Sequence, residues 1–373
     1  MDEVRRPPRV VMFGTYDASR HPRVAVLRDG LEAAGCSVVE CNVPLGDSTA
    51  DRVALAGAPW KAPKLVARVG RIWTQLRRRA ATLPDPDVVV VGYLGHLDVH
   101  LARRLWPTAA LVLDHLVGLG DTLRDRQANA ALARGFDVVD RAALRAADLV
   151  VVDTPAHQAL LPAESRSKAV VVPVGATDDW FRRPEPRSGP LRAVFFGLYT
   201  PLHGAPVIGR AAAVLRGMPI RLTMIGHGQS LEETRAAADG AQVTWRDWLP
   251  AAELPGVVAD HDVCLGIFGT TAKAGRVVPT KAYQGAAAGC AILTSATAPQ
   301  RDAFGEAGCY VPAGDAMALA VSLAELAGDR EGLEERRRAG WRLADRHFRP
   351  AQAVRPLVQA IDRITVTASP VAS

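Results

Sequence analysis

Short apolar runs alternate with longer segments of helical periodicity along the sequence, and this alternation constrains the fold more than any other feature. The four valines within residues 87–91 have strand length and leave no polar face, which is typical of a parallel strand covered by helices on both sides. After the first apolar run, Val24, Leu27 and Leu31 recur at helical spacing. Gly35 ends that helix and completes a β-α-β unit. The sequence therefore predicts an α/β fold of doubly wound parallel sheets.

The predicted strands fall into two series separated by a proline-rich stretch. The first series covers residues 9–13, 38–43, 87–91, 110–113, 149–152 and 169–172, and the second covers 193–196, 222–225, 243–245, 263–267, 291–294 and 309–311. Four prolines within residues 173–190 cannot continue a helix or a central strand. We therefore predict domains at residues 1–173 and 191–347, a linker at 174–190, and a C-terminal segment, 348–373, that packs back on the first domain.

Composition excludes several other classes of protein. No apolar run among the 373 residues approaches the roughly 18 residues of a membrane span, and Gly and Pro are dispersed rather than repeated. The first nine residues lack the apolar stretch of a signal peptide, so we expect a cytoplasmic protein. Five cysteines without a Cys-x-x-Cys pair predict neither a disulfide framework nor a zinc site, and no other motif predicts a metal.

The net charge of +6 comes from one segment. Residues 61–80 hold seven Lys and Arg and no acid, so the rest of the chain is close to neutral. The segment is a basic amphipathic helix whose apolar face carries Leu65, Val69, Ile72, Trp73 and Leu76. In one interpretation, Arg68, Arg71 and Trp73 contact an anionic membrane surface, and the chain is a peripheral membrane protein. In the other, the apolar face of the helix packs on its own domain. Nucleic-acid binding is not expected, because residues 61–80 contain no aromatic residue other than Trp73.

The richest chemistry lies in residues 265–293, where a strand runs into a glycine-rich loop and a helix. Lys273, Arg276 and Lys281 occur with no acid between Phe268 and Gly289. Cations at the carboxyl end of a strand, beside a helix N-terminus, suit a pyrophosphate; the alternative is a solvated basic loop. The turn Gly226-His-Gly228 is either a second anion site or a tight structural turn. The first turn, from Gly14, lacks the Gly-x-Gly-x-x-Gly spacing of an NAD site.

The second half of the chain resembles the donor domain of retaining glycosyltransferases of family 4. Residues 196–204, 226–228 and 279–293 carry this resemblance. It implies the GT-B fold, with two facing Rossmann-like domains and an interdomain cleft, and it implies transfer of a sugar from a nucleotide diphosphate donor, such as a UDP-sugar, with retention of configuration and without a metal cofactor.

Several positions depart from the family pattern. Leu198 and His203 stand where members of the family carry an Arg and a Lys that bind the diphosphate, and Arg276 and Gln284 stand at the two usual glutamates. We infer that Lys273, Arg276 and Lys281 supply the missing positive charge. His203 either assists them or is a structural turn residue, and Gln284 can hydrogen-bond ribose. The predicted nucleotide-sugar site comprises Gly197, His203, Gly204, Gly226, Gly228, Phe268, Gly269, Lys273, Arg276, Lys281 and Gln284.

The acceptor side is predicted at strand ends of the first domain. Asp114 and His115 end the fourth strand, and Asp121 either faces the cleft or caps the next helix. These three residues would orient an acceptor hydroxyl. The loop residues Gly14, Thr15 and His21 would lie on the same side. We expect a lipid-linked or cell-envelope glycan as acceptor, with a small secondary metabolite as the alternative. A catalytically silent GT-B protein that binds a nucleotide sugar, a lipid or a partner enzyme is the alternative of another class.

Overall fold

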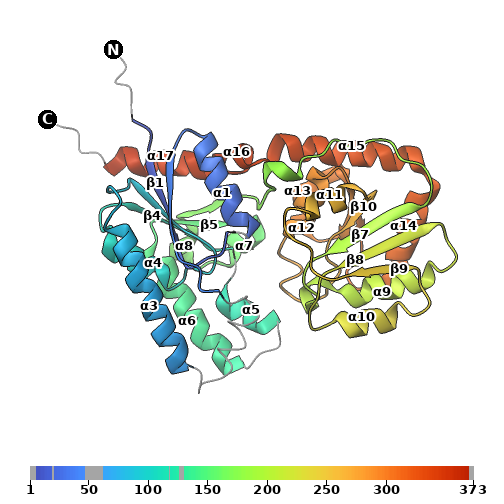
Figure 1. Ribbon diagram of the computed structural model, residues 1–373, viewed down its shortest axis with the longest axis horizontal. Coiled ribbons are helices and arrows are strands. Elements are labelled where there is room, and N and C mark those ends of the chain that lie inside the picture. The colour runs from blue at the N-terminus through green and yellow to red at the C-terminus, as the bar shows by residue number, and fades with distance from the viewer. Residues whose placement is uncertain (1–5, 19–20, 47–61, 117, 126–129, 369–373) are drawn as a thin grey trace, which may run out of the picture. The chain divides into compact units, whose positions relative to one another are not determined.

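The computed structural model describes residues 6–18, 21–46, 62–116, 118–125 and 130–368, and it divides the chain into two compact units (Figure 1). Unit 1 comprises residues 1–173 and 350–373, and unit 2 comprises residues 174–349. Each unit contains a six-stranded sheet in which every pairing is parallel. The prediction of two doubly wound α/β domains is confirmed.

The elements of unit 1 alternate as the apolar pattern predicts. Its strands are β1 (Arg9–Gly14), β2 (Ser37–Asn42), β3 (Val88–Val91), β4 (Ala110–Asp114), β5 (Leu149–Val152) and β6 (Ala169–Val171). Its helices are α1 (Pro22–Ala33), α3 (Ala62–Ala80), α4 (Asp98–Leu105), α5 (Leu119–Asp125), α6 (Ala130–Ala146), α7 (Pro155–Leu160), α8 (Ala163–Arg166), α16 (Pro350–Ala353) and α17 (Arg355–Ala368).

Unit 2 repeats the same plan. Its strands are β7 (Leu191–Phe196), β8 (Ile220–Ile225), β9 (Val243–Arg246), β10 (Val263–Leu265), β11 (Ala291–Ser295) and β12 (Gly308–Val311). Its helices are α9 (Ala205–Val214), α10 (Leu231–Ala237), α11 (Leu254–Ala259), α12 (Thr280–Ala287), α13 (Ala298–Phe304), α14 (Ala316–Gly328) and α15 (Arg330–His347), with short 3₁₀ turns η2 (Asp178–Trp180), η3 (Pro201–His203) and η4 (Gly305–Ala307).

Successive residues of a strand face opposite layers, and the unit 1 sheet is apolar on both sides. Val11 and Phe13 pack in one cluster with Leu76 and other residues of α3, α4 and α6. Val10 and Met12 pack in another cluster with residues of α1 and α17 and with Val354, which lies between α16 and α17. Figure 1 shows these two sets of helices on the two faces of the sheet. The α3 helix is therefore part of the layered core.

The strand order places a reversal point in the middle of each sheet. Unit 1 has the order β2-β1-β3-β4-β5-β6, and unit 2 has β12-β11-β10-β7-β8-β9. The chain winds outward in opposite directions from β1 and β3, and likewise from β7 and β10. Connections leave these points on opposite faces, which opens a crevice at the carboxyl ends of the strands where α/β proteins bind their ligands.

Residues 174–190, which we predict as a linker, are packed against unit 2. Trp180 is 4% exposed, and its ring stacks on Phe196 with centroids 5.6 Å apart. The backbone N–H of Arg182 donates to the carbonyl of Ala287 at 3.0 Å. The prolines thus end regular structure in this segment without separating it from the domain that follows.

Two glycines in helices give a matched test of this packing. A Cβ on Gly30 of α1 would lie 2.5 Å from the carbonyl oxygen of Pro350 and from a methyl of Val354, whereas a Cβ on Gly70 of α3 would meet nothing within 4 Å. Gly30→Ala should therefore lower stability by about 1–3 kcal/mol, through overpacking against α16. Gly70→Ala should raise it by about 0.5–1 kcal/mol, since alanine favours the helix.

Urea unfolding monitored by circular dichroism measures both effects. Opposite shifts of the unit 1 transition are expected for the two variants. Equal shifts would contradict the docking of residues 350–368 on α1.

Candidate functional site

The reversal point of unit 2 holds Lys281, which lies beside the backbone of Gly197. Gly197 follows β7 directly, and Lys281 lies in the first turn of α12. A Cβ on Gly197 would lie 3.5 Å from the Lys281 Nζ, and the Nζ lies 3.5 Å from the centroid of the Phe195 ring. The structure thus brings together two residues that we predict from motifs more than 80 positions apart in the sequence.

Lys281 is buried, at 5% exposure, and its Nζ has no hydrogen-bond partner among the residues that the structure describes. Burial lowers the pKa of Lys281 well below its ordinary value of 10.5. The Phe195 face attracts a cation, but it does not replace the hydration that an ammonium group loses on burial. An anion placed at Gly197 would supply this missing partner.

The surrounding loops depend on glycine because their backbones are in contact. A Cβ on Gly226 would lie 2.1 Å from the Gly197 carbonyl oxygen, and a Cβ on Gly228 would lie 2.6 Å from the Tyr199 nitrogen. Both glycines have positive φ. The Gly226–Gly228 segment therefore packs as a tight turn against the loop after β7, and the α10 helix that follows has only seven residues.

A second pair of loops packs in the same way. Gly204 has φ +61, and its Cβ would lie 2.4 Å from the Gly269 nitrogen. Phe268 is fully buried, and its N–H donates to the carbonyl of His203 at 3.0 Å. The His203 Nδ1 lies 3.0 Å from the Thr200 hydroxyl. This contact is consistent with the structural role of His203 in the turn. Its assistance to phosphate binding stays a prediction.

The other predicted donor residues lie before and within α12. Lys273 and Arg276 are half-buried and share a turn, in which the N–H of Arg276 donates to the Lys273 carbonyl at 3.0 Å. Gln284 is 5% exposed on α12, one turn beyond Lys281. The roles that we predict for these three residues stay predictions. The sequence does not reveal the part of Phe195, because a strand phenylalanine resembles any core residue.

The reversal point of unit 1 is organised by Asp98, which we do not predict from the sequence. Its Oδ2 accepts hydrogen bonds from the Thr15 N–H at 2.9 Å and hydroxyl at 2.8 Å, and its Oδ1 accepts one from the Trp73 Nε1 at 2.9 Å. Gly14 has positive φ and lies against the same carboxylate. The His21 ring stacks on Tyr93, with centroids 4.1 Å apart. The loop that we predict for the acceptor is thus fastened to the start of α4.

Asp114 and His115, which we predict together as acceptor-side residues, have side chains in different surroundings. Asp114 is 2% exposed and pairs with Arg23, whose Nε lies 3.3 Å from Oδ1 and whose Nη1 donates to the Pro173 carbonyl at 2.6 Å. Burial raises the pKa of Asp114, and Arg23 opposes this rise. The ion pair gives Asp114 a structural role that the sequence does not reveal, and its contact with an acceptor stays a prediction.

His115 lies in a cluster of histidines and acids at the strand ends. Its ring centroid is 5.4 Å from that of His96 and 5.5 Å from that of His157, and the His96 Nε2 lies 3.2 Å from the Asp140 Oδ1. Burial lowers the pKa of His96 to about 4, against an opposing effect of the Leu94 carbonyl, and raises the pKa of Asp140 to about 6. His96 follows β3 as His115 follows β4, so the rule that places functional residues at strand ends could have found it.

Asp121 does not occupy the cap position of α5. The helix begins at Leu119, so Asp121 lies within its first turn. The N–H groups of Leu119 and Gly120 donate to the two carboxylate oxygens of Asp140, at 3.1 and 3.2 Å. Asp140 of α6 therefore caps α5, and the contact of Asp121 with an acceptor stays a prediction.

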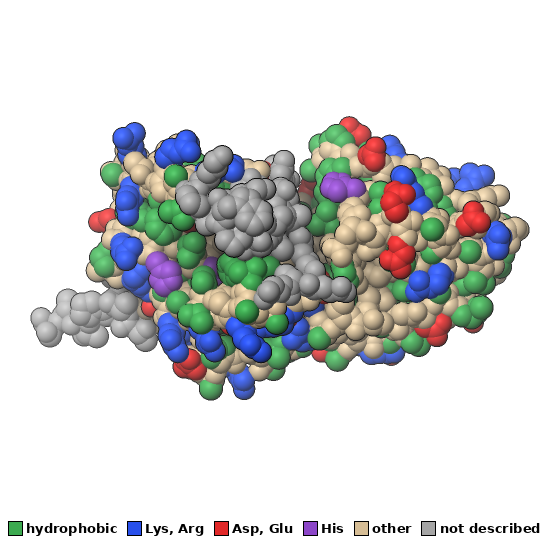
Figure 2. All heavy atoms as spheres, turned by 90° about the horizontal axis from the view of Figure 1, so that it is seen from below, with side chains coloured by type: hydrophobic (Ala, Val, Ile, Leu, Met, Phe, Trp, Pro, Cys, Tyr) green, Lys and Arg blue, Asp and Glu red, His purple; other side chains and the backbone are tan. Residues whose placement is uncertain are grey.

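The basic helix predicted for residues 61–80 is α3, and its apolar face turns inward. Ile72 and Leu76 are buried in the unit 1 core, and Trp73 packs against that core as it donates to Asp98. Arg68 donates to the Leu45 carbonyl, while Arg71 is exposed. The indole of Trp73 thus makes its contacts within unit 1. The structure therefore gives no support to the predicted contact of Trp73 with lipid. In the left half of Figure 2, Lys and Arg side chains (blue) lie on the visible face of unit 1.

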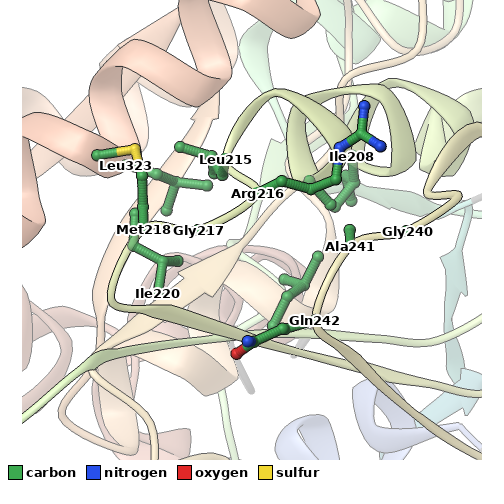
Figure 3. A pocket seen from close by; sticks show the side chains of 12 residues that line it. Ile208, Leu215, Arg216, Gly217, Met218, Ile220, Gly240, Ala241, Gln242 and Leu323 are labelled. Carbon is green, nitrogen blue, oxygen red and sulfur yellow. The ribbon is translucent and has the colours of Figure 1, made fainter.

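A cavity of about 90 Å³ in unit 2 lies away from these strand ends (Figure 3). It is lined by apolar side chains such as Leu215, Met218 and Leu323. Ile220, the first residue of β8, also lines it, so the cavity lies at the amino end of that strand. In the described part of the chain, no helix is long and apolar enough to cross a membrane.

Residues 190–329 match the family model described as "Glycosyl transferases group 1". The matched range runs from β7 through α14 and contains both Gly197 and Lys281. Most of unit 2 is therefore similar to group 1 glycosyl transferases, and the resemblance to GT-B glycosyltransferases predicted from the sequence is confirmed.

Solved structures with this fold match along almost the whole chain. Sucrose-phosphate synthase (tll1590) from Thermosynechococcus elongatus has a TM-score of 0.73 at 16% identity, covering 98% of this chain and 100% of that one. Anabaena Alr3699/HepE in complex with UDP-glucose has a TM-score of 0.65 at 12% identity, covering 96% and 98%. An α,α-trehalose-phosphate synthase (UDP-forming) from Burkholderia vietnamiensis has a TM-score of 0.65 at 13% identity, covering 98% and 99%. No curated protein sequence matches the chain. At these identities the likeness concerns the fold.

The unpartnered ammonium makes a testable contribution to stability. Lys281→Met should stabilise the ligand-free protein by about 1–3 kcal/mol, because a methionine of similar length fills the site without a buried charge. The folded protein gives up the Lys281 proton at lower pH than the unfolded chain does, so wild-type stability rises as pH approaches 10.5. The advantage of the variant should therefore shrink between pH 7 and pH 10.

Urea titrations of both proteins across this pH range provide the measurement. A methionine variant that is less stable than wild type at pH 7 would contradict the assignment of Lys281 as a buried cation without a partner.

Proposed function

We propose that this protein is a glycosyltransferase whose unit 2 binds a nucleotide diphosphate sugar, and that UDP carries the sugar. The observation that carries this proposal is the buried Lys281 at the reversal point of a group 1 glycosyl transferase domain. Anabaena Alr3699/HepE, which has the same fold, is known in complex with UDP and with UDP-glucose, and this supports the choice of nucleotide. The acceptor binds unit 1.

Electrostatics explains how this chain could hold the donor despite its altered motif. Lys281 would donate a charge-assisted hydrogen bond to a diphosphate oxygen at Gly197, where the absent side chain lets the phosphate approach the backbone. Lys273 and Arg276 precede the same helix and add positive charge on its N-terminal side. These groups would stabilise the negative charge that develops on the departing diphosphate, without a metal ion at the donor.

On the acceptor side, His115 and Asp121 would orient the attacking hydroxyl. In a transfer with retention, the departing phosphate itself can accept the hydroxyl proton, so positioning is the main task of unit 1. A lipid-linked or cell-envelope glycan remains the proposed acceptor, and a small secondary metabolite is the alternative. A silent protein that binds a nucleotide sugar without turnover is the competing function, because Leu198, Arg276 and Gln284 replace residues that are usual in the family.

The test of turnover is release of UDP from UDP-glucose, UDP-galactose and UDP-N-acetylglucosamine by the full chain, with and without candidate glycan acceptors. Turnover of at least one donor is expected. A product that keeps the anomeric configuration of the donor, seen by NMR, would support retention, and an inverted product would overturn it. Tight UDP binding without any turnover would favour the silent binding protein.

Removing the Lys281 ammonium should weaken UDP binding by about 2–3 kcal/mol, or roughly 30–150-fold, as expected for a charge-assisted phosphate contact. Calorimetric titration of Lys281→Met with UDP measures this loss. Lys168→Met is the matched control, since that amine lies in unit 1 and donates to backbone carbonyls of Arg145 and Ala147. Equal affinities of the two variants would overturn the proposed donor site.

Peripheral membrane binding, if α3 provides it, must be electrostatic, because the apolar face of α3 is buried. Arg71, Arg77 and Arg78 are exposed on this helix. Their replacement by Gln should weaken sedimentation with phosphatidylserine vesicles roughly 100-fold, at about 1 kcal/mol per arginine.

The control replaces Arg338, Arg342 and Arg346, which are exposed on α15 of unit 2, with Gln. This variant has the same net charge and should sediment like wild type. Wild-type sedimentation should also disappear at high salt, because exposed charges are screened. Binding that resists salt, or that both variants lose equally, would contradict a role of α3.

A further inference from the structure

Two histidines and one aspartate lie close together inside unit 1, and apolar packing does not explain why three such polar side chains are buried at one place. His96 follows β3, His115 follows β4 and Asp140 lies on α6, so three separate elements converge. Each residue offers one ligand atom, and these atoms all lie within 4.8 Å of one another. His96 is 2% exposed, His115 is 5% and Asp140 is 9%.

The ring nitrogens of the two histidines lack partners. No ring nitrogen of His96 or His115 makes a well-oriented hydrogen bond to any residue that the structure describes, although the His96 Nε2 lies 3.2 Å from the Asp140 Oδ1. Buried imidazole nitrogens are normally hydrogen-bonded or bound to a metal, because an unsatisfied buried polar group costs about 1–3 kcal/mol. Here one ring nitrogen of each histidine lies within 4.8 Å of a carboxylate oxygen of Asp140. The cluster therefore lacks an electron-pair acceptor that could bind the ring nitrogens and the carboxylate oxygen at the same time.

The third ligand, Asp140, is held in place by the backbone. Its two oxygens accept the N–H groups of Leu119 and Gly120, which leaves each oxygen with further lone pairs. Outer hydrogen bonds of this kind fix the orientation of ligating carboxylates in metal sites. The Asp140 Oδ1 already lies 3.2 Å from the His96 Nε2.

We propose that His96, His115 and Asp140 bind a divalent transition-metal ion of the zinc class. In a tetrahedral site with bonds of about 2.0–2.1 Å, neighbouring ligand atoms lie roughly 3.3 Å apart. The His96 and Asp140 atoms already have this separation, and the His115 ring would move toward them. Two imidazoles and a carboxylate are ligands that such ions prefer, and Mg²⁺ or Ca²⁺ would prefer oxygen alone.

Three protein ligands leave a coordination position for water or for an oxygen of a bound molecule. The site lies at the carboxyl ends of β3 and β4, the edge of the sheet where ligands of such domains bind. The ion would be held by residues of unit 1 alone, and the proposal does not depend on the proposed sugar transfer. The proposal differs from the sequence-based expectation of no metal. That expectation missed the site because residues 96, 115 and 140 have no recognisable spacing in the sequence.

Metal binding by the purified full chain tests the proposal. After chelator treatment and dialysis, titration with Zn²⁺ in a calorimeter should show one ion per chain. Titration with Co²⁺ should give the intense visible absorption of a tetrahedral site, and Zn²⁺ should displace it. Zn²⁺ should also raise the melting temperature, since it binds the folded chain.

His96→Ala and Asp140→Asn should each weaken Zn²⁺ binding by more than the roughly 10–100-fold that loss of an outer partner costs. Asp140→Asn keeps an oxygen that can cap α5, so it guards against a variant that fails to fold. His100→Ala on α4 is the matched control and should bind like wild type. Absence of stoichiometric binding, or binding that His96→Ala and Asp140→Asn leave intact, would overturn the site.

Discussion

Parallel pairing of β1 with β3, and of β7 with β10, sets the positions of nearly all candidate functional residues in this protein. In a parallel sheet all carboxyl ends lie at one edge, and each strand must be followed by a crossover. Residues that follow different strands are thereby brought together although they are distant in sequence. Thr15 with Asp98 and Gly197 with Lys281 are two such meetings. Each joins the two strands that flank a reversal point.

The two units use these edges with different chemistry. In unit 2, a cation is buried against glycine backbone and a phenylalanine ring, and no acid among the described residues is bonded to it, which suits an anionic ligand. In unit 1, imidazoles and carboxylates dominate, and the deeply buried Arg23 is paired with Asp114. Similar folds can thus present opposite electrostatic environments, because the residues after each strand vary without changing the sheet.

The strands were predictable because their signal is local. Runs such as Val88–Val91 are buried on both faces, so a stretch without polar residues is enough to reveal them. Structural ends differ from predicted ones by a residue or two, as at β7, which begins at Leu191 rather than Ala193. The fold class and the interest of Lys281 followed from the same reasoning about strands and their ends, whereas Gly197 was predicted from the resemblance to family 4.

Partnerships between distant residues were not predictable in this way. The sequence marks Trp73 as apolar and Asp114 as polar, but it does not show that Trp73 donates to Asp98 or that Arg23 reaches Asp114. Each contact joins different elements and depends on side-chain direction after packing. The same limit applies to Asp140, whose carboxylate caps a helix other than its own.

The return of residues 350–368 to unit 1 has a consequence for synthesis of the chain. Leu357 and Ile361 are fully or almost fully buried beside Val10 and Met12, so the first strand shares its core with nearly the last helix. Unit 2 is continuous in sequence and can fold as soon as it leaves the ribosome. Unit 1 must wait, with one face of its sheet only partly covered, until residues 350–368 have been translated. The domain made first is therefore finished last, and the nascent protein exposes apolar strands during that interval.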